Sequence, residues 1–106
     1  MKTRLSMLFV LWSSLVQLGA IQEPQWKIYP NPATEYVTVE FKLQLPSRVI
    51  VKILDPNGQL VRLLTNDLYP TGSHFIKTTL FSIPTGYYLI HCEQGDETWT
   101  KKFVVK

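Results

Sequence analysis

The chain has 106 residues, which is room for one domain. Its formal charge is +3 at pH 7, but residues 1–20 contribute Lys2 and Arg4 and no acid, so the remainder has nine Lys and Arg against eight Asp and Glu, a net +1. A nucleic-acid-binding protein would carry clustered Lys and Arg on one face, and the only adjacent basic pair is Lys101-Lys102, so that class is excluded. The single cysteine, Cys92, excludes a disulfide within the chain.

Residues 1–20 are typical of an export signal. Lys2 and Arg4 supply a positive start, residues 5–16 are apolar apart from three serines, and Gly19-Ala20 ends in the small residues that a signal peptidase accepts. A retained membrane anchor is the alternative, but the apolar run is shorter than the ~20 residues that span a bilayer. We therefore expect a cleaved signal peptide over residues 1–20.

The rest of the chain has no helical periodicity. Apolar and polar residues alternate, and turn-forming residues recur about every eight to twelve positions, which is the pattern of a β-sandwich. A domain of this size buries about 60% of its unfolded surface, enough for independent folding. We expect a short segment over residues 21–27, then an all-β domain over residues 28–106: a single immunoglobulin-like antiparallel β-sandwich of about seven strands.

The first two strands are predicted over residues 26–29 and 36–43. In the second, four apolar residues should face the core, and Thr38, Glu40 and Lys42 should face water. The apolar residues are Val37, Val39, Phe41 and Leu43.

A third strand contains Val49, Val51 and Ile53. Asp55-Pro56-Asn57-Gly58 then predicts a hairpin turn, because Pro56 presets φ and Asn57-Gly58 tolerates left-handed backbone. The fourth strand is expected over residues 59–64 and a loop over residues 66–72.

Three further strands follow, with turns at residues 83–86 and 94–97. Their expected ranges are residues 73–80, 87–93 and 98–105. Four aromatic residues are expected to pack in the core between the two sheets: Trp26, Phe41, Tyr87 and Phe103.

Two prolines bracket one asparagine in Pro30-Asn31-Pro32, directly after the first strand. Neither proline can donate to a sheet, and each pushes the preceding residue into an extended conformation. The sequence predicts a stiff corner here, which would switch the chain from one sheet to the other.

Enzyme motifs are absent: there is no glycine-rich phosphate loop, HExxH, CxxC or GxSxG. His91 and Cys92 are adjacent on one strand and point to opposite faces, so they cannot share a site. We expect Cys92 to be a buried structural thiol and His74 and His91 to be surface residues. No cofactor and no metal are expected.

Several motifs together resemble the C-terminal sorting domain of type IX secretion, the Por secretion system family, in its type A form. Pro30-Asn31-Pro32 opens an alternating strand, and Asp55, Gly58 and Val61 fit a D-x-x-G-x-x-V hairpin. The pairing of Leu68 with Gly72 is similar to an L-x-x-x-G turn. Ile83-Pro84-Thr85-Gly86-Tyr87-Tyr88 is similar to L-P-x-G-x-Y, with Ile83 in place of leucine. Gly95 and Lys101-Lys102-Phe103-Val104-Val105-Lys106 resemble the closing tail.

The resemblance implies a non-enzymatic domain that is exported to the periplasm and then read by the outer-membrane type IX translocon. The sortase-like peptidase that attaches cargo to the cell surface is a second implied partner; no nucleic acid and no small-molecule substrate are implied. Only residues 21–25 lie between the expected signal and the first strand, so we expect no cargo domain. The alternative is a small periplasmic or cell-surface binding, adhesion or signalling module with the same fold.

Recognition is expected at exposed motif residues. The final strand is the first choice, because it is expected at a sheet edge where lysines discourage uncontrolled pairing. The alternative is that residues 102–106 only complete the core, with the lysines as ordinary edge protection, and that recognition lies elsewhere, at the Pro30-Asn31-Pro32 corner next. Val104 and Val105 cannot both face inward, so one of them should lie outside. The candidate residues are Pro30, Asn31, Pro32, Gly86, Tyr88, Lys101, Lys102, Val104 and Lys106.

Overall fold

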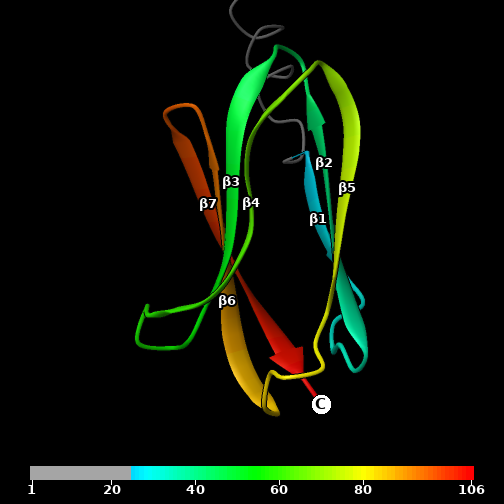
Figure 1. The fold of residues 1–106 in the computed structure, drawn as a ribbon, viewed down its shortest axis with the longest axis vertical. Helices are drawn as coiled ribbons and strands as arrows, with labels where there is room; N and C mark the ends of the chain where they lie inside the picture. The colour runs from blue at the N-terminus through cyan, green and yellow to red at the C-terminus, as the bar shows by residue number, and fades with distance from the viewer. Residues whose placement is uncertain (1–24) are drawn as a thin grey trace, which may run out of the picture.

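The computed structural model describes residues 25–106; the expected signal peptide and residues 21–24 lie outside the described residues. The described part consists of seven strands and contains no helix (Figure 1). The strands are β1 Trp26–Tyr29, β2 Tyr36–Leu43, β3 Ser47–Leu54, β4 Leu60–Tyr69, β5 Gly72–Thr79, β6 Gly86–Gln94 and β7 Glu97–Val105.

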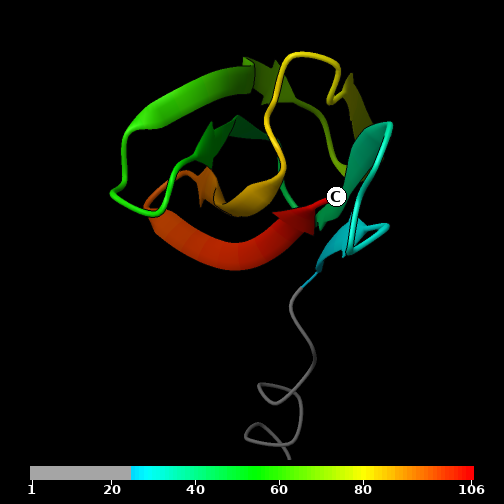
Figure 2. The same cartoon turned by 90° about the horizontal axis from the view of Figure 1, so that it is seen from below.

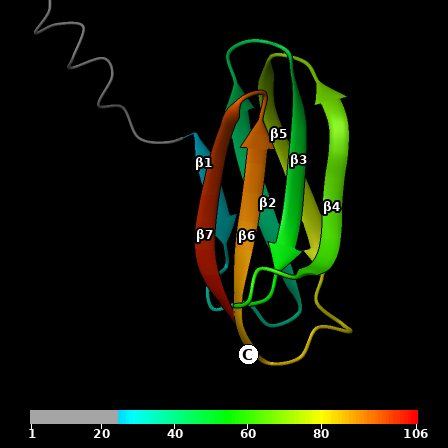
Figure 3. The same ribbon diagram turned by 90° about the vertical axis from the view of Figure 1, so that its left-hand side faces the viewer.

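Two antiparallel sheets face each other. The first, sheet A, has the order β1-β2-β5, and the second, sheet B, has the order β4-β3-β6-β7. Figure 3 shows the four strands of sheet B side by side, with sheet A behind them. The expectation of an all-β sandwich of seven strands is confirmed, and β7 is an edge strand as predicted.

The core lies between the sheets and follows the alternation of the sequence. In β2 and β3 every second residue is fully or almost fully buried, because successive side chains of a strand point to opposite faces. Phe41 from sheet A and Phe103 from sheet B are the largest of the fully buried side chains. Cys92 is 2% exposed, so its predicted burial is confirmed.

One end of the core is aromatic. The ring of Trp26 stacks on Phe41 with centroids 4.6 Å apart and lies 5.5 Å from Trp99 of β7. Phe41 also contacts Tyr69 at 5.2 Å, edge to face. The centroid of the His74 ring lies 5.3 Å from that of Phe41, and His74 Nε2 donates to the carbonyl of Pro70 at 2.7 Å. His74 is half-buried, so the histidine expected at the surface also contacts this cluster through its ring.

The loop predicted over residues 66–72 is largely strand. Strand β4 continues to Tyr69 and β5 begins at Gly72. Asn66 and Asp67 have loop-like composition, but they pair with Ile50 and Val49 on an edge strand, where polar side chains remain in water. Tyr69 holds the end of the strand, because its hydroxyl lies 2.6 Å from Thr65 Oγ1 and its ring packs on Phe41.

The burial of three side chains, Tyr87, Tyr88 and Thr38, differs from expectation. Tyr87 is 59% exposed, whereas Tyr88 is 8% exposed and packs in the core. The register pairs Tyr87 with Val104 and Tyr88 with the buried Phe103, which fixes which tyrosine faces inward. Thr38, expected in water, is 8% exposed, because β2 is the central strand and Thr38 lies between Tyr29 and Lys77 of the neighbouring strands.

The hairpin after β3 has the predicted turn. The carboxylate of Asp55 accepts hydrogen bonds from the backbone N–H groups of Asn57 and Gln59, both at 2.9 Å. Gly58 has φ +85°, a conformation that a residue with a side chain rarely adopts. The corner at residues 30–32 does not switch sheets as predicted, because β1 and β2 pair with each other in sheet A.

Candidate functional site

The Pro30-Asn31-Pro32 corner lies against the end of β7, although more than 70 residues separate them in the sequence. Figure 2 shows the red end of β7 running up to the segment between β1 and β2. We call this contact the joint; it consists of residues 30–33 and 102–106. Both prolines of the corner are preceded by cis peptide bonds, Tyr29-Pro30 and Asn31-Pro32.

Main-chain hydrogen bonds form the centre of the joint. The N–H of Ala33 donates to the carbonyl of Val104, and the N–H of Lys106 donates to the carbonyl of Ala33, both at 2.8 Å. Ala33 and Val105 thereby form a parallel bridge, and Ala33 is fully buried. The corner occupies the outer edge of β7 at this end, which satisfies backbone groups that an edge strand would otherwise leave open.

The side chain of Asn31 extends this pairing by one step. Its Oδ1 accepts the N–H of Val104 at 3.0 Å, and its Nδ2 lies 3.5 Å from the carbonyl of Lys102. An amide side chain offers both an acceptor and a donor, so it can replace a peptide group at a strand edge. Asn31 therefore acts as a short substitute for strand backbone beside β7.

The adjacent lysines Lys101 and Lys102 face opposite directions. Lys101 donates from Nζ to the carbonyl of Trp26 at 3.1 Å and so ties β7 to β1 of the other sheet. Lys102 points to the outside of sheet B, where its Nζ lies 5.2 Å from the centroid of the Tyr87 ring. Of this pair, Lys102 is the one whose charge is presented on the outer face.

The two final valines divide as predicted. Val105 is 2% exposed and belongs to the core, whereas Val104 is half-buried and lies beside Tyr87 on the outer side. Lys106 is exposed. The joint therefore presents Pro30, Pro32, Val104 and Lys106 at one end of the sandwich, close to Lys102.

Gly86 and Tyr88 support β7 from the neighbouring strand. Gly86 pairs with Val105, and Tyr88 pairs with Phe103. The hydroxyl of Tyr88 donates to the carbonyl of Pro84 at 2.6 Å, which fixes the turn before β6. Tyr88 is buried, so we assign it a structural role rather than a role as an exposed recognition element.

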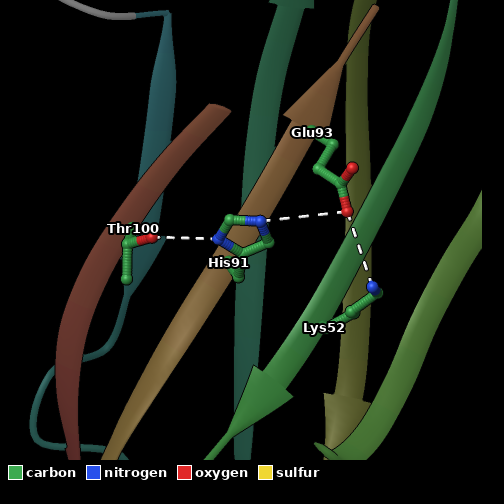
Figure 4. Close-up of polar contacts among 4 residues, drawn as sticks. All are labelled: Lys52, His91, Glu93 and Thr100. Carbon is green, nitrogen blue, oxygen red and sulfur yellow. Dashed lines mark hydrogen bonds and ion pairs between the residues drawn. The ribbon is translucent and has the colours of Figure 1, made fainter. Parts of the chain in front are cut away.

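The side chains of Cys92 and His91 lie on opposite faces of β6, as expected. Burial raises the pKa of the Cys92 thiol to about 12, with the nearby charge of Lys101 acting in the opposite direction. His91 lies on the outer face, where Nδ1 is 2.9 Å from Thr100 Oγ1 and Nε2 is 3.8 Å from Glu93 Oε2 (Figure 4). Lys52 Nζ reaches the same Glu93 oxygen at 3.5 Å.

The chemistry available in residues 25–106 is limited. No group of three or more His, Cys, Asp or Glu side chains in this range could hold a metal ion. A thiol with a raised pKa is a poor nucleophile at neutral pH, because the thiolate is the reactive form. No helix in the same range could cross a membrane.

The sequence did not predict that the two groups of candidate residues meet. The corner and the final strand were separate candidates, and the structure joins them through Asn31 and Ala33. The one local signal is the pair of prolines around Asn31. Neither proline has an N–H group, so the Asn31 side chain is the polar side chain of the corner that can both donate and accept a hydrogen bond.

One comparison with known proteins identifies a family. Residues 27–106 match the family model described as "Secretion system C-terminal sorting domain". A search of curated proteins gives no match.

Proposed function

The chain belongs to the family of secretion system C-terminal sorting domains, and from this we propose that its β-sandwich is a non-enzymatic tag that the type IX secretion machinery reads. The observation that carries the proposal is the extent of the match, because residues 27–106 include β2 to β7 in full and all of β1 except Trp26. The family serves secretion rather than catalysis, which agrees with a buried, unreactive Cys92.

The proposal covers the route as well as the role. Residues 1–20 act as the export signal to the periplasm, and the domain over residues 28–106 is then recognised at the outer membrane. The translocon is the first partner, and the sortase-like peptidase is the second. The product is released or held at the cell surface.

We place recognition at the joint and its surroundings. Asn31 and Val104 are held together there by a 3.0 Å hydrogen bond, and Pro30, Pro32 and Lys106 are exposed beside them. Residues Gly86 and Tyr88 act indirectly by positioning β7, and Lys101 acts by tying β7 to β1.

A reporter experiment tests this function. A reporter protein inserted between residues 20 and 21 is expressed in a bacterium with a working type IX translocon and in a strain that lacks it. We expect the reporter at the surface or in the medium of the first strain and in the periplasm of the second. An identical distribution in both strains would contradict the sorting role and favour a periplasmic or surface binding module.

The same strains test the joint. Asn31→Ala should reduce surface delivery, whereas Asn66→Ala, which removes an exposed amide from the opposite edge of sheet B, should not. Sequencing the N-terminus of the exported chain, expressed without the reporter, should place its start near Ile21.

A further inference from the structure

The outer face of sheet B carries a row of apolar side chains across all four strands. The register places Leu54 of β3 opposite both Leu60 of β4 and Leu89 of β6, and it places Tyr87 of β6 opposite Val104 of β7. Leu63 of β4 lies opposite Lys52, two residues before Leu54 on β3. We call this row the apolar belt; its members are Leu54, Leu60, Leu63, Tyr87, Leu89 and Val104.

The apolar belt is exposed to water. Leu60, Leu63 and Tyr87 are 60%, 49% and 59% exposed, and Leu54, Leu89 and Val104 are half-buried between them. Single exposed apolar residues are ordinary, but a row that spans a sheet marks an interaction surface. The outer face of sheet A also exposes Tyr29, Tyr36 and Phe75, but polar side chains accompany each of them. Tyr29 donates to Glu40, Lys77 lies over the Tyr36 ring, and Phe75 is paired with Glu40.

Positive charge borders the apolar belt. Lys102 is paired with Leu89 in the register, and its Nζ lies 5.2 Å from the centroid of the Tyr87 ring. Lys52 is paired with Leu63 and shares Glu93 with His91, as Figure 4 shows. Within residues 25–106, no acidic side chain lies within ion-pair distance of Lys102.

The apolar belt continues directly into the joint. Val104 and Lys102 belong to the outer face through their side chains and to the joint through the backbone groups that bind Asn31 and Ala33. The edge of β7 is occupied by the corner at this end, so a partner that approaches β7 here meets its outer face rather than free backbone.

We propose that the apolar belt is the docking surface for a segment of the secretion machinery that combines apolar side chains with acidic ones. The apolar residues would cover Leu60, Leu54 and Tyr87, and a carboxylate would pair with Lys102. The choice of partner rests on charge complementarity and on the continuity of the apolar belt with the joint. This inference rests on the proposed sorting function and names the surface and the partner chemistry.

Two variants and two matched controls test the proposal in the full chain. The variants are the double substitution Leu60→Ser with Tyr87→Ser, and the single substitution Lys102→Glu. The controls on sheet A are Phe75→Ser, which removes an equally exposed aromatic residue, and Lys42→Glu, which reverses an exposed lysine. Urea unfolding of each variant confirms that it is folded.

The first readout is delivery of the inserted reporter by the type IX strain. Each variant in the apolar belt should lower surface delivery by about tenfold, because a few central residues carry most of the binding free energy of an interface. Neither control should change it. Normal delivery of both variants, with normal delivery of the wild type, would overturn the docking surface and leave the sorting function intact.

The second readout is independent of sorting. A synthetic peptide of alternating leucine and glutamate is titrated into the full chain, with a leucine–lysine peptide as its control, and backbone amide shifts are followed by NMR. We expect shifts at the apolar belt with the acidic peptide only, and about tenfold weaker binding to Lys102→Glu. Equal binding of both peptides, or a concentration-dependent dimer that the double substitution abolishes, would overturn the assignment. Failure of the wild type to sort would refute the sorting function itself.

Discussion

The two edge strands of sheet B, β7 and β4, differ in whether their outer backbone groups are covered. At β7 the corner covers the outer edge through Ala33 and Asn31, and the strand carries Lys101 and Lys102. Strand β4 has ten residues, three of which are exposed leucines, and no backbone group on its outer edge has such a cover in residues 25–106.

Strand β4 is protected by irregularity and by one cation. Its pairing with β3 shifts register twice, and such bulges interrupt the flat edge that another strand would need. Arg62 crosses to the end of β5 and donates to Thr78 Oγ1, Ser82 Oγ and the carbonyl of Thr79.

In sheet B, the edge whose backbone groups are covered is also the edge that exposes side chains for recognition on its outer face. The β7 edge is closed by main-chain groups, so its outer face can display Lys102 and Val104 without inviting strand addition. Each edge also has one cation that reaches the other sheet, Lys101 at β7 and Arg62 at β4.

Removing the closure of β7 should have the largest effect. Deleting Val104 to Lys106 removes the buried side chain of Val105 and the main-chain bonds to Ala33. We expect a loss of about 3 to 5 kcal/mol of unfolding free energy, measured by urea titration of tryptophan fluorescence. Leu68→Ser on β4, where the side chain is 70% exposed, should cost less than about 0.5 kcal/mol. Similar losses for the two changes would mean that the edges do not differ.

The two cations should differ in the opposite sense. Arg62→Met removes hydrogen bonds to three acceptors, and Lys101→Met removes the bond to one. We expect losses of about 2 kcal/mol for Arg62→Met and below about 1 kcal/mol for Lys101→Met in the same urea assay. A larger loss for Lys101→Met would show that the tie between the sheets matters more at β7.

Asn31 should contribute less than Arg62. Asn31→Ala leaves the Val104 N–H without its acceptor, which should cost about 1 kcal/mol and speed hydrogen exchange of that amide. Asn31→Asp keeps an oxygen acceptor and should restore most of the stability. Unchanged exchange at Val104 in Asn31→Ala would refute the role of Asn31 as substitute backbone.

Cys92 offers the finest measure of β7 opening, because Trp99 of β7 is its partner in the register. With a thiol pKa of about 12, labelling by a thiol reagent at pH 8 should require opening, and Asn31→Ala should speed it roughly fivefold. Leu68→Ser serves as the control and should leave the rate unchanged.

The same thiol predicts a pH dependence. Its folded pKa is raised above the ordinary value of 9.0, so its contribution to stability is full below pH 9 and is lost as the pH rises toward 12. Cys92→Ala should remove this part of the alkaline destabilisation, which thermal unfolding between pH 8 and pH 11 measures. Identical pH profiles would contradict the assignment.

Local patterns predicted the seven strands approximately and the buried apolar residues of β2 and β3. Alternation identified β2 and the burial of Val37 and Phe41, and the residue types of Asp55–Gly58 identified the turn. Local composition misled at Asn66 and Asp67, because an edge strand tolerates the polar residues that also suit loops. Tyr87 and Tyr88 alternate equally well in either phase, so only the register with Val104 and Phe103 decides which of them is buried.

The candidate site was predicted less completely. The motif residues identified both halves, Pro30-Asn31-Pro32 and the strand that ends in Lys106, but not their contact, because hydrogen bonds between residues 31 and 104 leave no periodic trace in a sequence. The apolar belt was missed for a similar reason, since its members come from four strands and only the cross-strand pairing brings Leu60, Leu54 and Leu89 together.

The contact between Asn31 and Val104 also indicates whether the domain has finished folding. The two residues are 73 positions apart, and closing a loop of that length costs roughly 4 kcal/mol of chain entropy. Such a contact forms when the intervening strands have already condensed, because their packing is what brings the ends together. A receptor that contacts Asn31 and Val104 at once therefore meets that pair in finished domains, so reading the joint selects completed molecules from those still folding.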